Sequence, residues 1–218
     1  RHTRCSRDWS SDVCSSDLRA QYARAVQGER HLNGQRRARP HEALMEKIYA
    51  KARAIRLAAF DVDGVLTDGT LYMTGEGEEI KAFNSLDGHG LKMLRESGVE
   101  LAIITGRTSR SVELRARNLG IQHLFQGVED KAGCFRSLVQ ARGLEAAQVS
   151  YMGDDVVDLP VLTRCGLALA VPEAPLLVRQ HVDYVTQGGG GRGAVREACE
   201  LILHAQDKLA PALEAYLK

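Results

Sequence analysis

From about Met45 onward, short apolar runs alternate with longer segments in which apolar residues recur at helical spacing. Several of the longer segments stop at a glycine, which is common just past the end of a helix. We expect strands at Leu57–Phe60, Val99–Thr105, Ile121–Phe125, Gln148–Met152, Leu167–Val171 and Tyr184–Thr186. We expect helices at Glu46–Arg53, Asp87–Ser97, Thr108–Leu119, Lys131–Arg142, Leu159–Arg164 and Ala194–Ala210, with a helical turn at Pro175–His181. This alternation predicts an α/β fold of three layers (αβα), in which helices cover both faces of a mostly parallel sheet.

Two stretches depart from the alternation. Extended runs at Thr70–Thr74 and Glu79–Phe83 flank Gly75-Glu76-Gly77, which predicts a β-hairpin after the first strand. The run Gly188–Gly193 matches the spacing of a dinucleotide-binding loop, but no strand follows its helix to complete that unit. We therefore interpret it as a flexible closing segment.

Composition supports one globular domain and excludes several classes of function. The chain has 218 residues, 44% of them hydrophobic, and a formal net charge of +1. Residues 45–218 are mildly acidic, so nothing favours nucleic-acid binding, and no apolar run reaches the roughly 20 residues of a membrane span. The cysteines form no Cys-x-x-Cys pair and are expected to be inert thiols in a reducing cytoplasm: Cys5, Cys14, Cys134, Cys165 and Cys199.

The first 44 residues differ from the rest of the chain. They carry nine Lys and Arg against five Asp and Glu, and Asp8–Leu18 resembles a translated sequencing adapter. We expect residues 1–44 to be a non-native or disordered leader, and residues 45–218 to form a single domain. A natural disordered arm or a transit peptide is the alternative, although Asp8, Asp12 and Asp17 are unusual in transit peptides.

Polar and charged residues follow the predicted strands. Asp61 and Asp63 follow the first predicted strand, and Thr105-Gly106-Arg107 follow the second. Lys131 opens the helix after the third strand. Gly153-Asp154-Asp155 follow the fourth strand. In open α/β sheets ligands bind beyond the carboxyl ends of strands. An Asp-x-Asp-Gly match alone arises by chance in roughly one chain in twenty. Because such residues follow four strands of one predicted sheet, they are better explained as parts of a single site than as separate solvated turns.

These residue types suit phosphoryl transfer. The Asp61 carboxylate can attack phosphorus, and a divalent cation held by Asp61 and the Asp154-Asp155 pair would remove its repulsion from the phosphate dianion. Lys131 would add a fixed positive charge and keep Asp61 ionised. Thr105 can hold a phosphate oxygen, and Asp63 is placed to protonate the leaving alkoxide and then activate water.

The motifs resemble those of the haloacid-dehalogenase (HAD) superfamily of Mg²⁺-dependent phosphohydrolases. The resemblance covers about residues 50–210. Within it, the closest match is to the 3-deoxy-D-manno-octulosonate 8-phosphate phosphatases, on Asp61–Gly69, Phe83–Gly88, Ile104–Arg107, Leu124–Gly127 and Gly153–Pro160.

This resemblance implies a cytoplasmic, cap-less enzyme of lipopolysaccharide core synthesis that uses Mg²⁺ and an aspartyl-phosphate intermediate. Asp61 would be the nucleophile and a metal ligand. Asp63 would be the acid/base, a substrate contact and a metal ligand through its backbone carbonyl. Asp154 would complete the metal site with Asp155 nearby, and the hairpin would form a flap that helps to build a homotetramer.

The resemblance also implies a phosphate and sugar-acid site. Thr105 and Lys131 would grip the phosphate, and Arg107 and Arg115 suit capture of a carboxylate. Further substrate contacts fall on Asn84, Ser85, Leu86, Asp87, Gly88 and Lys92. Lys92 stands where some members have Arg, and Gly188–Gly193 would let the C-terminal segment close over a neighbouring subunit's site.

Two alternatives remain. A cap-less phosphatase for a sialic-acid-type nonulosonate 9-phosphate would carry much the same motifs, and a phosphate-release panel with both sugar acids discriminates them. A signalling receiver domain also combines acidic residues, Thr and Lys around a phosphorylated Asp. In a receiver the acidic pair follows the first strand and the phosphorylated Asp comes later, which is the opposite of the order found here.

Overall fold

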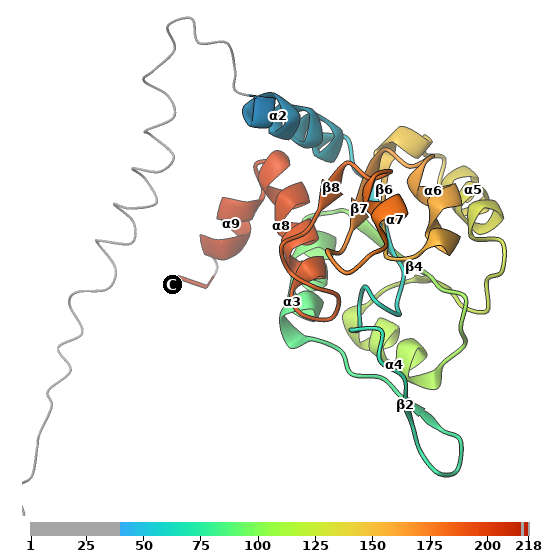
Figure 1. Ribbon diagram of the computed structural model, residues 1–218. Coiled ribbons are helices and arrows are strands. Elements are labelled where there is room, and N and C mark those ends of the chain that lie inside the picture. The colour runs from blue at the N-terminus through green and yellow to red at the C-terminus, as the bar shows by residue number, and fades with distance from the viewer. Residues whose placement is uncertain (1–39, 215, 218) are drawn as a thin grey trace, which may run out of the picture. The chain divides into compact units, whose positions relative to one another are not determined.

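The computed structural model describes residues 40–214, 216 and 217 (Figure 1). The predicted leader, with its adapter-like stretch 8–18, lies outside the described residues apart from positions 40–44. Helix α2 (Pro40–Arg53) begins earlier than the predicted start at Glu46, since proline is well tolerated in the first turn of a helix. A compact unit spans Ala43–Lys218 and contains the strands.

The predicted parallel sheet is confirmed. A six-stranded sheet has the order β5-β4-β1-β6-β7-β8, and every neighbouring pair in it is parallel. The strands are β1 (Leu57–Phe60), β4 (Glu100–Ile104), β5 (His123–Phe125), β6 (Val149–Gly153), β7 (Leu167–Ala170) and β8 (Tyr184–Val185). β1 and β6 are buried along their whole length, as expected of strands that helices cover on both faces. Phe60 lies opposite Ile103 and Met152, so the carboxyl ends of β1, β4 and β6 are level.

Helices form the outer layers. Helix α3 packs against α8 on one face of the sheet, and α5 and α6 contact each other on the opposite face (Figure 1). The helices are α3 (Ser85–Glu96), α4 (Arg110–Leu119), α5 (Lys131–Ala141), α6 (Leu159–Leu162), α7 (Leu176–Arg179), α8 (Ala194–Ala205) and α9 (Leu209–Glu214), with 3₁₀ turns η1 (Ala146–Gln148) and η2 (Val156–Asp158). Over residues 40–214, no helix is long and apolar enough to span a bilayer.

The predicted hairpin is present but short. β2 (Tyr72–Met73) and β3 (Glu79–Ile80) pair antiparallel and project from the sheet (Figure 1). Within residues 40–214 this hairpin is the only pair of strands between β1 and α3, so the described chain carries no cap domain there. Large apolar side chains on the hairpin are exposed: Leu71, Tyr72, Met73 and Ile80.

The prediction of one terminal helix over Ala194–Ala210 is wrong. α8 ends at Ala205, and α9 starts at Leu209. Asp207 between them has a φ of 57°, a left-handed conformation that ends an α-helix and that Asp adopts more readily than most residues. The Lys208 amide donates to Leu203 O (2.8 Å), which satisfies a carbonyl of the last turn.

The run Gly188–Gly193, here called the glycine strap and predicted to be a flexible closing segment, packs against the loop after β1. The Gly191 amide donates to Val65 O (2.9 Å), in the loop that follows β1. A Cβ at Gly190 would lie 1.9 Å from Gly64 O, so the two backbones approach too closely for any side chain. The strap therefore contacts the loop after β1 of its own chain.

Candidate active site

The loop after β1 places Asp61 at the carboxyl edge of the sheet. The Asp61 amide donates to Met152 O of β6 (2.9 Å), and its Oδ1 accepts from the Val62 amide (2.7 Å). The chain then turns back, with the Leu66 and Thr67 amides donating to Val62 O (2.9 and 3.0 Å). Gly64 in this turn has a φ of 86°, which favours glycine. The turn holds Asp61 buried but at the edge where ligands enter.

Lys131 lies against Asp61 as predicted. It is the first residue of α5, whose N-cap Asp130 accepts from the Gly133 amide (2.8 Å). Its Nζ is 2.6 Å from Asp61 Oδ2 and 2.7 Å from Asp158 Oδ1. Burial alone would lower the pKa of Lys131, but the two carboxylates raise it above its ordinary value. Lys131 is therefore a buried, charged ammonium group.

The acidic cluster contains Asp158 in place of the predicted Asp155. Carboxylate oxygens of Asp61, Asp154 and Asp158 lie within 4.8 Å of one another. Asp155 is exposed, and its side chain caps η2 by accepting from the Val156 amide (2.7 Å). Asp158 was not among our predicted ligands, although the 3₁₀ turn returns it to the β6 edge four positions after Asp154.

Asp158 organises this corner of the site. It is fully buried, and its Oδ1 accepts from the Tyr151 hydroxyl (2.7 Å) in addition to Lys131. Its Oδ2 accepts from the amides of Asp154 (3.1 Å) and Asp155 (3.2 Å), which fixes the turn after β6. Asp158 thus holds both the backbone of Asp154 and the ammonium group that contacts Asp61.

The cluster carries an excess of negative charge. Three carboxylates share one lysine, which leaves two negative charges uncompensated when all are ionised. Burial, followed by Asp158, raises the pKa of Asp61 to about 6. Burial, followed by Asp61, raises the pKa of Asp154 to about 7. Clustered carboxylate oxygens are ligands that Mg²⁺ prefers, and a divalent cation would balance the charge, so the residues present fit the predicted metal.

The remaining predicted catalytic residues lie at the same edge. Thr105 is buried directly after β4, which is the strand that pairs with β1. The Asp63 carboxylate pairs with Lys81, which our sequence reasoning missed, and lies 3.8 Å from Arg107 Nε. Lys81 directly follows β3 of the exposed hairpin, where a lysine is ordinarily solvated, so the sequence carried no signal of burial.

Several predicted substrate contacts have structural partners. The Asn84 side chain caps α3 by accepting from Leu86 and Asp87 amides (2.7 and 3.3 Å), and it donates to Gly191 O in the glycine strap (3.2 Å). The Arg115 guanidinium donates to Asn84 O (3.1 Å) and lies over the Phe83 ring.

Asp87 is another predicted substrate contact, and its side chain has partners within the protein. The carboxylate is buried and accepts from the amides of Gly193 (3.3 Å) and Arg196 (2.8 Å) at the start of α8. The other predicted positions lie on α3: Ser85 and Leu86 are exposed, Gly88 is buried and Lys92 is half-buried. A Cβ at Gly88 would lie 2.1 Å from Arg115 Nη2, so this glycine makes room for the arginine.

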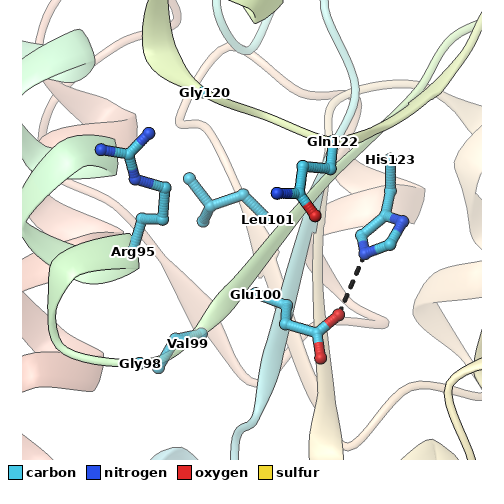
Figure 2. A pocket seen from close by; sticks show the side chains of 8 residues that line it. All are labelled: Arg95, Gly98, Val99, Glu100, Leu101, Gly120, Gln122 and His123. Atoms are coloured by element: carbon cyan, nitrogen blue, oxygen red, sulfur yellow. Dashed lines mark hydrogen bonds and ion pairs between the residues drawn. The ribbon is translucent and has the colours of Figure 1, made fainter.

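A separate pocket of about 240 Å³ opens at the opposite edge of the sheet (Figure 2). It lies where β4 and β5 begin, and Figure 2 shows His123 bonded to Glu100 (2.9 Å) there. Its lining comprises Arg95, Gly98, Val99, Glu100, Leu101, Gly120, Gln122 and His123. Because parallel sheets bind ligands beyond their carboxyl ends, the cluster around Asp61 is the stronger candidate for catalysis.

Known proteins similar to this chain include 3-deoxy-D-manno-octulosonate 8-phosphate phosphatases. No protein-family model matches the chain. It is 49% identical over 165 residues to 3-deoxy-D-manno-octulosonate 8-phosphate phosphatase KdsC of Escherichia coli (strain K12), an alignment that covers 76% of this chain and 88% of that protein.

Solved structures agree with this relationship. A probable YrbI family phosphatase from Pseudomonas syringae pv. phaseolica 1448a is 53% identical, with a TM-score of 0.79 over 79% of this chain and 98% of that chain. The 3-deoxy-D-manno-octulosonate 8-phosphate phosphatase from Moraxella catarrhalis, in complex with magnesium ion, phosphate ion and KDO, is 45% identical, with a TM-score of 0.78 over 79% and 99% of the two chains. As its motifs predict, the chain belongs to the 3-deoxy-D-manno-octulosonate 8-phosphate phosphatase family of the HAD superfamily.

Proposed function

We propose that the protein is a Mg²⁺-dependent phosphatase that hydrolyses 3-deoxy-D-manno-octulosonate 8-phosphate, in the cytoplasm, as a step of lipopolysaccharide core synthesis. The observation that carries the proposal is the buried cluster of Asp61, Lys131, Asp154 and Asp158 at the carboxyl edge of the sheet. Its relatives described as such phosphatases support the choice of substrate.

Asp61 is the proposed nucleophile. Its carboxylate attacks phosphorus as the bond to the sugar oxygen breaks, which forms an aspartyl phosphate. Mg²⁺ held by Asp61, Asp154 and the Asp63 carbonyl would neutralise negative charge on the phosphate and the attacking carboxylate. Lys131 contacts Asp61 Oδ2 (2.6 Å), so it is placed to stabilise charge on the transferring oxygens.

Asp63 is the proposed acid and base. It donates a proton to the sugar oxygen as that group leaves, and the resulting carboxylate then takes a proton from the water that attacks the aspartyl phosphate. The buried hydroxyl-bearing residue Thr105 is the proposed phosphate contact with Lys131. Asp155 is proposed to lie near the metal site without being a ligand, and its side chain caps η2.

The substrate's sugar acid is proposed to lie between Arg107 and the start of α3. Arg107 is half exposed, so its guanidinium is accessible for bidentate capture of a carboxylate. Arg115 and the segment Asn84–Gly88 border the same region, with Lys92 on α3. The Asp87 carboxylate is proposed to act indirectly, by holding the glycine strap and α8 in place.

We also propose that the protein forms a homotetramer through the β2–β3 hairpin. The exposed apolar side chains of Leu71, Tyr72, Met73 and Ile80 would be buried in such an assembly. Light scattering coupled to size-exclusion chromatography tests this directly. A tetramer that Met73→Glu dissociates would support the proposal, and a monomer at micromolar concentration would contradict it.

A phosphate-release panel tests the proposed activity. We expect Mg²⁺-dependent release from 3-deoxy-D-manno-octulosonate 8-phosphate, loss of release in EDTA or in Asp61→Asn, and much slower release from a nonulosonate 9-phosphate. Preference for the nonulosonate ester would overturn the substrate assignment. Near-wild-type turnover by Asp61→Asn would overturn the nucleophile assignment.

A further inference from the structure

Lys81 is a buried lysine that the reaction scheme above leaves without a role. Its side chain is only 2% exposed, although it comes from the projecting hairpin. Lysines are almost never fully buried unless they are paired, and Lys81 pairs with Asp63 and with Glu79 Oε1 (2.5 Å). The hairpin therefore delivers a fixed cation to the proposed acid and base.

Four charges of alternating sign meet at this point. Glu79 Oε2 accepts from Arg107 Nη2 (3.0 Å), and Arg107 Nε lies 3.8 Å from Asp63 Oδ2. Lys81, and then Arg107, hold the pKa of Glu79 below its usual range, so Glu79 is a carboxylate that anchors both cations. Two cations and two anions balance, unlike the acidic cluster around Asp61.

The two oxygens of Asp63 have different surroundings. Oδ1 is bound by Lys81, whereas Oδ2 is buried and has no hydrogen-bond partner among the described residues. A buried carboxylate oxygen without a partner is costly and rare in proteins. Fixing one oxygen with a lysine leaves the other oriented and free to exchange a proton with a ligand.

Alternation along the hairpin strand explains how Lys81 reaches the site. Glu79 and Lys81 point to one face of the extended chain, and Ile80 between them points to the other, where it is exposed. The charged face thus meets Asp63 and Arg107 while the apolar face remains outside. The placement of the hairpin accordingly fixes the orientation of Asp63.

We propose that Lys81 is a positioning residue that binds Asp63 Oδ1 and so directs Asp63 Oδ2 at the leaving oxygen of the substrate. The inference rests on the proposed function, in which Asp63 donates the proton that the sugar alkoxide takes up as its bond to phosphorus breaks. An alkoxide leaving group needs that proton, whereas a p-nitrophenolate does not. Loss of Lys81 must therefore affect the two kinds of ester differently.

The test compares Lys81→Met with wild type on 3-deoxy-D-manno-octulosonate 8-phosphate and on p-nitrophenyl phosphate, both with Mg²⁺. Because Asp63 also serves as the base in hydrolysis of the aspartyl phosphate, a step that both esters share, the comparison uses rapid-quench release of the sugar or of p-nitrophenol in the first turnover. We expect this first-turnover rate to fall about a hundredfold for the sugar phosphate, the scale of general acid catalysis, and to change less than about threefold for the aryl phosphate. Lys81→Arg should recover part of the lost rate. Lys51→Met, which removes a lysine paired with Asp183 (2.5 Å) on the body of the protein, is the matched control and should leave both rates unchanged.

Other outcomes would overturn the inference. An equal fall in the first-turnover rate for both esters, or a raised KM for the sugar phosphate with an unchanged first-turnover rate, would mean that Lys81 does not position Asp63 as the acid. If Lys81→Met fails to fold, the test uses Glu79→Gln, which loosens the anchor of Lys81. This variant must show the same difference between the two esters, with a smaller fall in rate. An equal fall for both esters in Glu79→Gln would reject the proposal. Absence of Mg²⁺-dependent release by the wild type would instead overturn the proposed function itself.

Discussion

Charged side chains gather at both edges of the parallel sheet, but the two groups differ in net charge and in exposure to solvent. At the carboxyl edge the buried Asp61 and Asp158 pair with the buried Lys131, and the half-buried Asp154 adds a third carboxylate to the cluster. At the amino edge Glu100 pairs with Arg142 (2.8 Å) and His123 (2.9 Å), and the side chains of Glu100 and Arg142 are 36% and 42% exposed.

The pKa directions follow this difference. Arg142 is the main cause that lowers the pKa of Glu100, whereas burial and Asp158 raise the pKa of Asp61 to about 6. An exposed ion pair contributes about 0–1 kcal/mol and has little other consequence. A buried site with excess charge opposes folding until a cation binds, and such sites are typical of function. These differences identify the carboxyl edge as the catalytic edge of the sheet and the amino edge as a structural one.

The largest effect is expected for Lys131→Met, which removes the cation of the carboxyl edge. Asp61 and Asp158 would then face each other without compensation, and breaking a buried pair in this way costs about 3–5 kcal/mol. Phosphate release should fall about a thousandfold, since the charge beside the transferring oxygens is also lost. Urea unfolding and phosphate release measure the two effects. Wild-type values for both would contradict the claim that the carboxyl edge depends on Lys131.

A smaller effect is expected from filling the contact between the glycine strap and the loop after β1. In Gly190→Ala the new Cβ would lie 1.9 Å from Gly64 O, and relieving that overlap should cost about 1–3 kcal/mol of unfolding free energy. Gly75→Ala at the hairpin tip meets no atom within 4 Å and is the matched control. Equal urea midpoints for the two variants would show that the strap yields to the added methyl group, as expected of the flexible segment that we predicted from the sequence.

The pH dependence of stability should report the raised pKa values at the carboxyl edge. The pKa values of Asp61 and Asp154 are about 6 and about 7 in the folded chain, above the ordinary 3.8. The folded, metal-free protein therefore binds protons more tightly than the unfolded chain does. Its stability falls as the pH rises from about 4, and the loss is complete above about pH 7. In EDTA, the urea midpoint should rise as pH falls from about 7 towards 4, and less so in Asp154→Asn. Identical slopes for wild type and variant would contradict the raised pKa of Asp154.

The smallest effect is expected for Arg142→Met, the amino-edge counterpart of Lys131→Met. Glu100 is partly exposed and keeps His123 as a partner, so stability should change by about 1 kcal/mol or less. Phosphate release should stay within about twofold of wild type. A large loss of activity in this variant would assign a functional role to the pocket at the amino edge.

Much of the site was predictable because parallel strands end at one edge. Asp61, Thr105 and Asp154 each follow a strand directly, and the register of β1, β4 and β6 brings those ends level. Lys131 opens a helix from the same edge, and its contact with Asp61 agrees with the predicted pair. Local pattern and topology suffice for side chains of this kind.

The remainder depends on contacts between distant segments. Asp87 is a predicted substrate contact, and only the structure shows that its carboxylate also accepts from amides at the start of α8, more than a hundred residues later in the chain. Asp155 was predicted as a ligand and Asp158 was not, because only the 3₁₀ turn shows which carboxylate returns to the sheet edge. Lys81 resembles a solvated hairpin residue in sequence, and its burial depends on how the hairpin sits on Asp63.

Trapping the covalent intermediate tests the central claim, that Asp61 is the nucleophile of a phosphatase site at the carboxyl edge. Protein quenched during turnover of 3-deoxy-D-manno-octulosonate 8-phosphate with Mg²⁺ is treated with borohydride, which reduces an aspartyl phosphate to an alcohol, and its peptides are sequenced by mass spectrometry. The account predicts reduction at Asp61, none at Asp63 in the same peptide, and none at all in Asp61→Asn. Reduction at another carboxylate, or continued turnover with Asp61 unmodified, would contradict it.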